Sequence, residues 1–279
     1  MFEENFERAC KSILGESVSF SQNNTPKLAY VFASPGAGKS SKLRHLLAKE
    51  FPVDDVPVIV EIDELKHFAP EEMQGKDRLR LVDSWYKRII DKAFENGRSI
   101  LIFRSKDMVH YNRTRNILKK AKDRGFTTEI NFLAINREKS RLGMVYRYEK
   151  ALKNMFEGNL DHTNYPRKPK FFYHYIYYKS LPETAKCCIK DSLVDKIRVF
   201  NRDGEQLSYI NKADNSKSET GILNSIKNER ERSWTVEEIT DYNRQVDDVK
   251  NMMRERGASH RETLINNLIV MKKSYPTRK

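Results

Sequence analysis

The fold is decided by residues 28–40, which read LAYVFASPGAGKS. An apolar run is followed by a glycine-containing turn and a Lys-Ser pair, and residues 43–48 then show the apolar spacing of an amphipathic helix. Gly36 and Gly38 let the backbone turn tightly enough for several N–H groups to point at one phosphate group. A strand, a glycine turn, Lys-Ser and a helix in this order predict a phosphate-binding P-loop. We therefore expect the chain to bind a nucleoside triphosphate.

Each position of this loop has an expected task. Lys39 would place an ammonium between the outer phosphates, the Ser40 hydroxyl would be a ligand of Mg²⁺, and the following helix would add its positive N-terminal end. Ala33 stands where the usual pattern has its first glycine. The donor is expected to be ATP or GTP, because no motif that reads the base is visible. The expected nucleotide-binding residues are Ser34, Pro35, Gly36, Ala37, Gly38, Lys39, Ser40 and Ser41.

Composition limits the class of protein. With 52 Lys and Arg against 39 Asp and Glu the net charge is +13, which favours a polyanionic partner: a nucleotide, nucleic acid or an acidic protein. The cysteines at 10, 187 and 188 have neither a disulfide nor a zinc spacing, so a reducing, cytoplasmic location is expected. No apolar run reaches the length of a membrane span, and the acidic N-terminus does not resemble a secretion signal.

Strand and helix patterns alternate along the chain. Strands are predicted at 28–33, 56–63, 99–103 and 129–135, with helices to about residue 50, at 77–96 and at 108–122 between them. This alternation predicts a parallel sheet covered by helices on both faces, an α/β fold of the P-loop kinase type. Further helices are predicted at 2–14 and 137–156, and a strand-turn-strand unit at 197–210. We expect a P-loop kinase domain over 1–212 and a helical C-terminal extension over 213–279 packed on or next to it.

The aromatic run at 171–178 reads FFYHYIYY and has two interpretations. It could be a helix that buries one aromatic face, with a further helix beginning after Pro182. It could also stack nucleic-acid bases, helped by Lys168, Lys170 and Lys179. Binding of nucleic acid is the less favoured of the two.

Asp63 is expected at the end of the second strand, at the same sheet edge as Lys39. A carboxylate there could accept the proton of a substrate hydroxyl, or it could cap the turn that begins at Glu64, and the residues alone do not decide between these roles. Glu61 is expected to point the same way and to hydrogen-bond a magnesium-bound water.

Arg147 falls in the helix after the fourth strand, and Arg167 falls in the loop beyond that helix. A guanidinium matches a transferring phosphoryl group, and kinases place arginines in this region to close over the phosphates. A solvated surface position is the alternative for either residue in so basic a chain.

The order of these motifs resembles the zeta toxins of bacterial toxin–antitoxin modules over residues about 25–212. The P-loop, the Asp63 stretch, the helix carrying Gly143 and the late strand and turn carry the resemblance together. The matching pieces are PGAGKS at 35–40, Ile62-Asp63 followed by Phe68 and Pro70, Leu142-Gly143, Arg147-Tyr148-Glu149, Arg167 ahead of Pro169 and His174, and IRVFNRDG at 197–204.

The resemblance implies a kinase, a phosphotransferase with an alcohol group as acceptor, that phosphorylates UDP-N-acetylglucosamine at the sugar 3′-hydroxyl and so stops growth. In this family Lys39 and Ser40 would hold the phosphates and Mg²⁺, Asp63 would deprotonate the acceptor, and Arg147 and Arg167 would stabilise the moving phosphoryl group. Family members are inhibited by a small helical antitoxin that covers the ATP site. An acidic antitoxin would suit the net charge of +13.

The expected acceptor pocket departs from the family. Zeta toxins bind the sugar nucleotide through acidic side chains on the helix before the third strand and at the end of that strand. Here the helix offers Lys87, and the strand ends at Phe103 and is followed by Arg104 and Ser105. Phe103 accepts no hydrogen bond, and a buried donor left without an acceptor costs about 1–3 kcal/mol.

We therefore expect a pocket that is basic and aromatic rather than acidic, formed by Asp63, Lys87, Phe103, Arg104 and Ser105. Three functions follow as hypotheses. The chain phosphorylates a nucleotide sugar; or it phosphorylates another anionic acceptor, such as a polynucleotide end or an NAD-type dinucleotide; or it is a nucleotide-binding interaction module without transfer. The catalytic carboxylate expected at Asp63 argues against the third.

Overall fold

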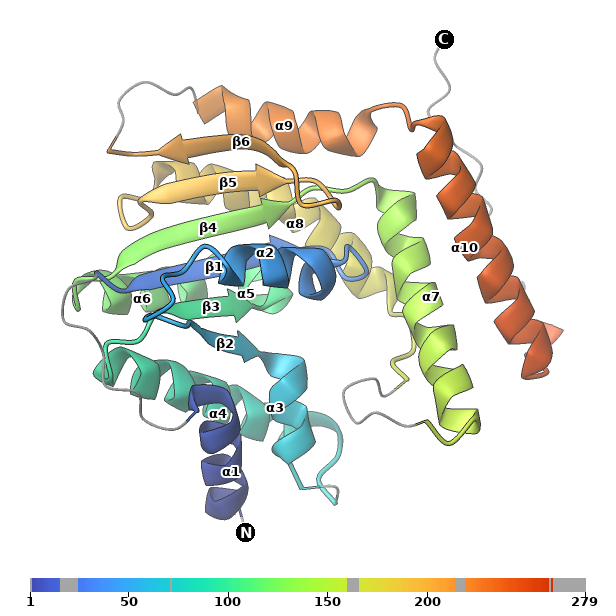
Figure 1. Ribbon diagram of the computed structural model, residues 1–279, viewed down its shortest axis with the longest axis horizontal. Helices are drawn as coiled ribbons and strands as arrows, with labels where there is room; N and C mark the ends of the chain where they lie inside the picture. Colours follow the sequence, from blue (N-terminus) through green and yellow to red (C-terminus); the bar gives the residue numbers. More distant parts are fainter. Residues whose placement is uncertain are drawn as a thin grey trace.

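A six-stranded sheet forms the centre of the computed structural model, which describes residues 2–15, 25–70, 72–159, 166–213, 219–260 and 262 (Figure 1). The strand order is β2-β3-β1-β4-β5-β6; the first five are parallel, and β6 is antiparallel to β5. The predicted parallel α/β fold is confirmed. The strands are β1 (Lys27–Ala33), β2 (Val58–Glu61), β3 (Ile100–Phe103), β4 (Thr127–Leu133), β5 (Lys196–Phe200) and β6 (Gln206–Asn211).

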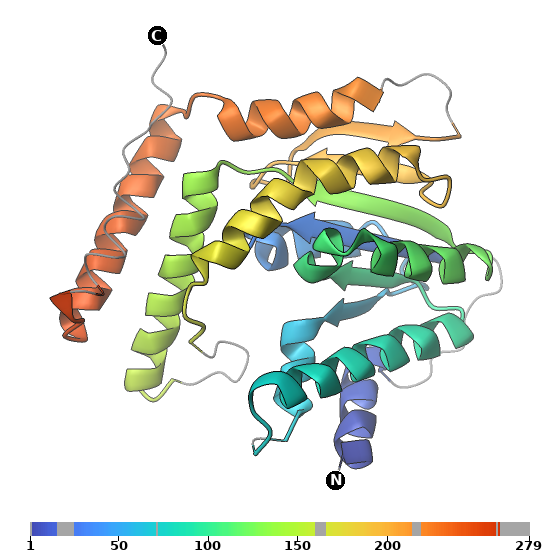
Figure 2. The ribbon, with the colours of Figure 1, turned by 180° about the vertical axis from the view of Figure 1, so that it is seen from behind.

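Helices cover both faces of this sheet, since β1 buries alternate side chains on each face. Leu28, Tyr30 and Phe32 face the larger core, beneath α4, α6 and α8, whereas Val31 faces a smaller core beneath α2 (Figure 2). The helices are α1 (Phe2–Leu14), η1 (Lys39–Leu43, a π-helical turn), α2 (Arg44–Ala48), α3 (Ile62–Phe68), α4 (Gly75–Glu95), α5 (Ser105–Val109), α6 (Tyr111–Lys122), α7 (Arg137–Phe156), α8 (Phe171–Lys190), α9 (Glu219–Glu231) and α10 (Val236–Glu255).

Several predicted boundaries shift where the chain leaves the sheet. β2 ends at Glu61, so Asp63 lies in the first turn of α3 instead of ending the strand. The single helix predicted at 108–122 is two helices, because His110 leaves the helical region with φ −110° and ψ 63°. β4 ends at Leu133, two residues earlier than predicted.

The helix boundary predicted at Pro182 is wrong, because α8 continues through this proline. Proline has no N–H, so the carbonyl of Tyr178, four residues earlier, loses its usual helical donor. Arg230 on α9 supplies a replacement, since its Nη2 donates to the Tyr178 carbonyl at 2.8 Å. The interaction that permits the continuous helix comes from a distant part of the chain.

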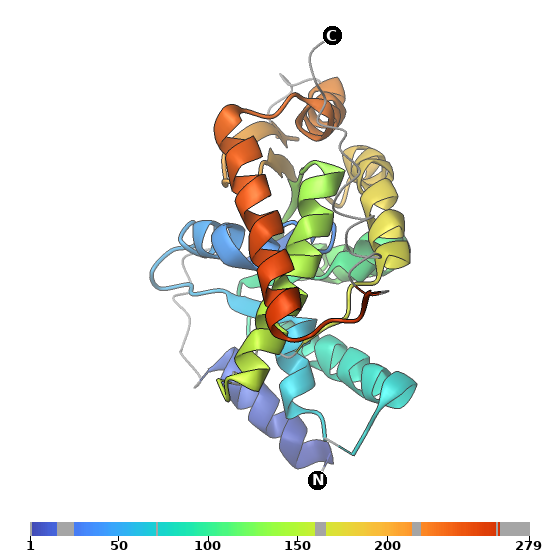
Figure 3. The same cartoon turned by 90° about the vertical axis from the view of Figure 1, so that its right-hand side faces the viewer.

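The C-terminal helices pack on the rest of the fold. Ile222 and Ile226 of α9 are buried in the larger core, and α10 lies along α7 with a small apolar core of its own (Figures 1 and 3). That core contains Leu142, Val145, Tyr242, Val246, Val249 and Met253. None of the helices in the described ranges is both long and apolar enough to cross a membrane.

Candidate active site

The glycine turn of residues 34–39 has the backbone that the P-loop pattern requires. Gly36 and Gly38 have φ of +79° and +92°, in the left-handed region that favours glycine. The turn leads from the end of β1 into the π-helical turn η1, which begins at Lys39. Of Ser40 and Ser41, two of the predicted nucleotide-binding residues, the structure describes the backbone and not the side chains.

Backbone contact joins this turn to α7. A Cβ atom on Gly36 would lie 2.0 Å from the carbonyl oxygen of Ser140, and one on Gly143 would lie 2.3 Å from the carbonyl oxygen of Gly36. No side chain fits at either position. The P-loop therefore rests directly on the helix that also carries Arg147.

A cavity of about 1090 Å³ opens at the carboxyl ends of β1, β2 and β3; we call it the central cavity. Its walls come from the P-loop, the start of α3, the end of β3, and parts of α4, α7, α8 and α10. Its described lining includes residues 34–39, Glu61, Asp63, Lys66, Asp83, residues 103–106, Gly143, Tyr146, Arg147, Lys170, Tyr173, Tyr177, Arg202, Arg244, Gln245 and Asp248.

Lys39 projects among carboxylates at the P-loop end of the cavity. Its Nζ lies 3.9 Å from Oε1 of Glu61, a buried residue at the end of β2. Burial lowers the pKa of Lys39, and the Glu61 and Asp63 carboxylates limit the shift. The Oγ of Ser34, also in the cavity wall, is buried and has no hydrogen-bond partner among the described residues. This end of the cavity is lined by charged and polar side chains.

Asp63 is surrounded by cations. It forms an ion pair with Arg167, and Lys66 donates to its Oδ1 at 2.9 Å. Burial alone would raise the pKa of Asp63, but Arg167, Lys66 and Lys39 outweigh burial and hold that pKa well below its usual value. The capping role is not seen, because Glu61 occupies the N-cap position of α3 and no side chain caps that helix.

The two predicted arginines lie beside Asp63. Arg147 on α7 lines the central cavity, where burial and the neighbouring Arg167 lower its pKa. Arg167 lies in the segment before α8 and, with Arg147 and Pro35, lines an adjoining cavity of about 130 Å³. The structure thus brings Lys39, Asp63, Arg147 and Arg167 together from four separate segments.

The opposite wall contains the residues that follow β3. Phe103 and Arg104 are buried and line the cavity, and the Ser105 hydroxyl donates to the Ala33 carbonyl at 2.8 Å. Arg104 is paired with two carboxylates, Asp83 at 2.5 Å and Asp107 at 3.2 Å. Its charge is therefore compensated, so this wall is less basic than the sequence predicts.

Lys87 does not belong to the cavity as the structure describes it. The residue is exposed, whereas Asp83, one turn earlier on α4, lines the cavity. α4 ends where the chain returns to begin β3, so each later turn of this helix lies about 5 Å further from the carboxyl edge of the sheet. The expected lysine in the acceptor wall is thus replaced by an acidic side chain. Asp83 stands four residues before Lys87 in the sequence, and this helical spacing was the signal that could have pointed to it.

Other lining residues were not among the predicted site residues. Tyr173 and Tyr177 on α8 face the cavity from the aromatic run, and Arg202 reaches it from the β5–β6 turn. Arg244, Gln245 and Asp248 come from α10, far along the chain from every predicted motif. Only the packing of α10 on α7 brings them to this place.

Comparison with known proteins agrees with this geometry. Residues 11–214 match the family model described as zeta toxin. No curated protein matches the chain. Among solved structures, the PezAT chromosomal toxin–antitoxin system of Streptococcus pneumoniae is similar with a TM-score of 0.66 and 15% identity, over 92% of this chain and 97% of that one.

A structure of AvrRxo1-ORF1:-ORF2 with ATP is similar with a TM-score of 0.55 and 16% identity, over 84% of this chain and 73% of that one. The native complex of the same two proteins gives 0.54 at 15% identity, over 98% and 84% of the two chains. At these identities the structural likeness shows the fold, a P-loop kinase-like sheet with C-terminal helices.

Proposed function

Because the chain belongs to the zeta toxin family, we propose that it is an ATP- or GTP-dependent kinase that phosphorylates a hydroxyl of a nucleotide sugar such as UDP-N-acetylglucosamine, and that this activity stops growth. One observation carries the proposal. Lys39, Asp63, Arg147 and Arg167 converge on the P-loop end of a cavity large enough for two nucleotide-sized ligands.

The donor half follows from the P-loop. Backbone N–H groups of the turn and the Lys39 ammonium would hold the outer phosphates, and the partly buried Arg147 would face the transferred group. The residues suit Mg²⁺, since the Glu61 carboxylate lines the cavity close to Lys39 and Ser40 follows in the P-loop. A bound Mg²⁺ would neutralise phosphate charge there.

Asp63 would accept the proton of the acceptor hydroxyl. The cations around it keep its carboxylate ionised, so it is ready as a hydrogen-bond acceptor throughout the physiological pH range. Its partner Arg167 lies beside Arg147, so a rotation of the Arg167 side chain toward the phosphoryl group would free one Asp63 oxygen for the substrate. In this scheme Arg167 changes partners as the acceptor enters.

The acceptor half suits a sugar nucleotide better than the sequence alone indicates. Asp83 lines the cavity and is oriented by Arg104, so it can accept hydrogen bonds from sugar hydroxyls. Tyr173 and Tyr177 offer aromatic faces to a base, and Lys106 is a nearby cation for a diphosphate. The alternative is another anionic acceptor, a polynucleotide end or an NAD-type dinucleotide, that uses the same aromatic and basic groups.

We also propose an antitoxin partner. One structural neighbour is described as a toxin–antitoxin system and another as a complex of two proteins, AvrRxo1-ORF1 and AvrRxo1-ORF2. A small acidic, helical protein that covers the donor side of the cavity would complement the net charge of +13.

Mass spectrometry of the purified protein with Mg-ATP or Mg-GTP and a panel of acceptors tests the function. One added phosphate on UDP-N-acetylglucosamine is expected, with loss of transfer in Lys39→Ala and Asp63→Ala and full transfer in the control Lys87→Ala. Transfer only to an oligonucleotide end or to NAD would establish the alternative. If no acceptor is phosphorylated and expression of Lys39→Ala stops growth as the wild type does, the kinase proposal fails.

A further inference from the structure

Part of the central cavity has no task in phosphoryl transfer. Its wall there is formed by Arg202 on the β5–β6 turn and by Arg244, Gln245 and Asp248 on α10. These α10 residues lie beyond residue 214, where the match to the zeta toxin family model ends. The family match therefore gives no role to the α10 residues of this wall.

This wall lies on the side of the central cavity where the phosphate donor would bind. Lys42, just after the P-loop, donates to Oδ1 of Asp203 at 3.1 Å, and a Cβ on Gly204 would be 3.5 Å from the side chain of Leu46. The β5–β6 turn thus rests on the P-loop helix. In Figure 3 the first turns of α10 lie on the side of α2, α10 then crosses in front of α7, and α8, which carries the aromatic residues of the cavity, lies on the opposite side. A nucleotide held by its phosphates at the P-loop would extend its nucleoside toward this wall.

The side chains have the right chemistry for a nucleoside. Arg202 is half-buried and makes no ion pair or hydrogen bond with the residues that the structure describes. A planar guanidinium in that position can stack on a base. Gln245 offers both a donor and an acceptor, and the Asp248 carboxylate accepts from base N–H groups or ribose hydroxyls.

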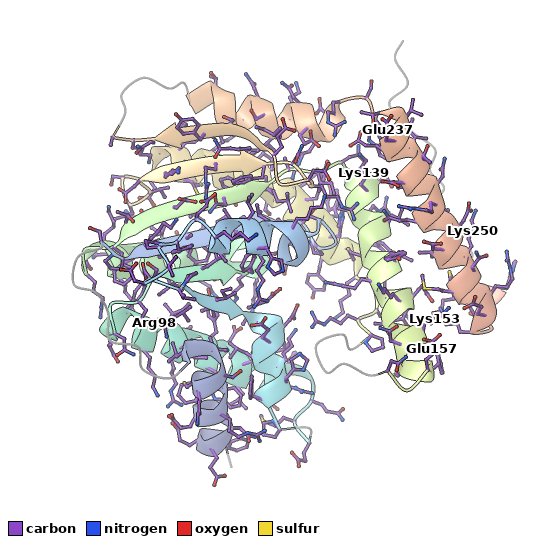
Figure 4. The ribbon with its side chains drawn as sticks, in the orientation of Figure 1. Arg98, Lys139, Lys153, Glu157, Glu237 and Lys250 are labelled. Carbon is purple, nitrogen blue, oxygen red and sulfur yellow. The ribbon has the colours of Figure 1, made fainter. Side chains whose placement is uncertain are left out.

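The position of α10 is fixed at both ends. Glu149, fully buried on α7, accepts two hydrogen bonds from Arg256 at 2.7 and 3.0 Å, and Lys139 pairs with Glu238 at the start of α10. Figure 4 shows Lys139 on α7 near the beginning of α10. Because α10 is held on α7, its polar side chains are placed before any ligand binds.

We propose that Arg202, Gln245 and Asp248 form the subsite for the base and ribose of the phosphate donor, which makes α10 a wall of the nucleotide site. This inference rests on the proposed function, because it assumes that the triphosphate binds at Lys39.

Calorimetric titration with Mg-ATP, Mg-GTP and Mg-tripolyphosphate separates the nucleoside from the phosphates. The wild type should bind its preferred nucleotide more tightly than tripolyphosphate. In Arg202→Ala and in Gln245→Ala/Asp248→Ala this preference should fall by about tenfold, a difference of about 1.4 kcal/mol, with tripolyphosphate binding unchanged. The control Asp247→Ala, at an exposed neighbouring position of α10 that does not line the cavity, should bind all three ligands as the wild type does.

The inference is overturned if the variants keep the wild-type preference, if they weaken tripolyphosphate equally, or if the wild type shows no preference. In each of these results the wild type still binds tripolyphosphate, so the proposed function is not affected. A wild type that binds none of the three ligands would instead remove the proposed function itself. Circular dichroism of each variant confirms that α10 remains folded.

Discussion

Arg167 forms an ion pair with Asp63, which ties the segment before α8 to the first turn of α3 at the edge of the central cavity. Both side chains are 30% exposed, so the pair is open to substrate. The carboxylate that would accept the proton and an arginine that would clamp the phosphoryl group are therefore partners when no ligand is present. Catalysis would require this ion pair to separate, so a substitution of Arg167 should change how the rate of transfer depends on pH.

Asp63→Asn keeps the size of the side chain and removes its ability to accept a proton. Transfer should fall by about 10²–10⁴-fold, the usual contribution of a general base, while the affinity for Mg-ATP changes little. Single-turnover kinetics and nucleotide titration on the same protein measure the two quantities. A variant that transfers phosphate at the wild-type rate would show that Asp63 is not the base.

Arg167→Ala should move the pH dependence of transfer. The cations around Asp63 lower its pKa, so protonation of Asp63 should not limit the wild-type rate until pH falls well below 3.8, its usual pKa. Without Arg167 that pKa rises, and the acid limb of the rate profile should shift to higher pH. Stability should depend on pH in the same direction. The ion pair stabilises the fold above about pH 3.8, and this contribution is lost as pH falls further. An unshifted limb in Arg167→Ala would contradict the pairing.

Gly143→Ala should displace the P-loop from α7. Alanine usually favours a helix by up to about 1 kcal/mol over glycine, but here its Cβ would lie 2.3 Å from the Gly36 carbonyl oxygen. Crowding of this kind costs about 1–3 kcal/mol, so both stability and nucleotide affinity should fall. Gly221→Ala in α9 is the matched control, because its Cβ would meet only the Ser208 hydroxyl at 3.6 Å. Equal melting temperatures for the two variants would refute the close contact.

Glu149→Gln should loosen α10. Glu149 is fully buried and paired with Arg256, which also pairs with Glu262. Removal of one partner from a buried ion pair costs up to about 3–5 kcal/mol, and the remaining Glu262 pair should reduce this cost. Urea unfolding should show this loss. Lys153→Ala removes a pair between the same two helices, to Glu255, but both of its side chains are exposed, so little change is expected (Figure 4). If α10 forms part of the nucleotide site, Glu149→Gln should also weaken nucleotide binding more than tripolyphosphate binding.

His174 should make the fold sensitive to acid. It is buried on α8, its Nε2 lies 2.7 Å from the Ser140 hydroxyl, and burial, with Arg141 and Arg137, lowers its pKa to about 4. The unfolded chain takes up this proton near pH 6.5 and the folded chain near pH 4, so stability should decrease as pH falls between these values, by up to about 3 kcal/mol. His174→Gln should lack this component of the pH dependence. A parallel loss in both proteins would place the sensitivity elsewhere.

The local signals in the sequence were sufficient for the glycine turn after β1. A glycine turn between a buried strand and a helix restricts its own backbone, so residues 34–40 predicted a P-loop without knowledge of the rest of the chain. Alternation of apolar strands with helices likewise predicted the parallel sheet, because periodicity and chain connection are properties of neighbouring residues. Asp63, Arg147 and Arg167 were located by the order of motifs, and the fold then brought them together.

The rest of the central cavity was decided by tertiary structure. Asp83 lines the cavity while Lys87 does not, because the direction of α4 relative to β3 sets which helical turn meets the sheet edge. α8 continues through Pro182 because Arg230, a residue of α9, donates to the carbonyl that the proline leaves free. Asp248 shares one cavity with Lys39 only because α10 is fixed to α7. Such contacts join residues far apart in the chain, so no local pattern of residues specifies them; the sequence by itself determined the phosphate-binding turn and its sheet.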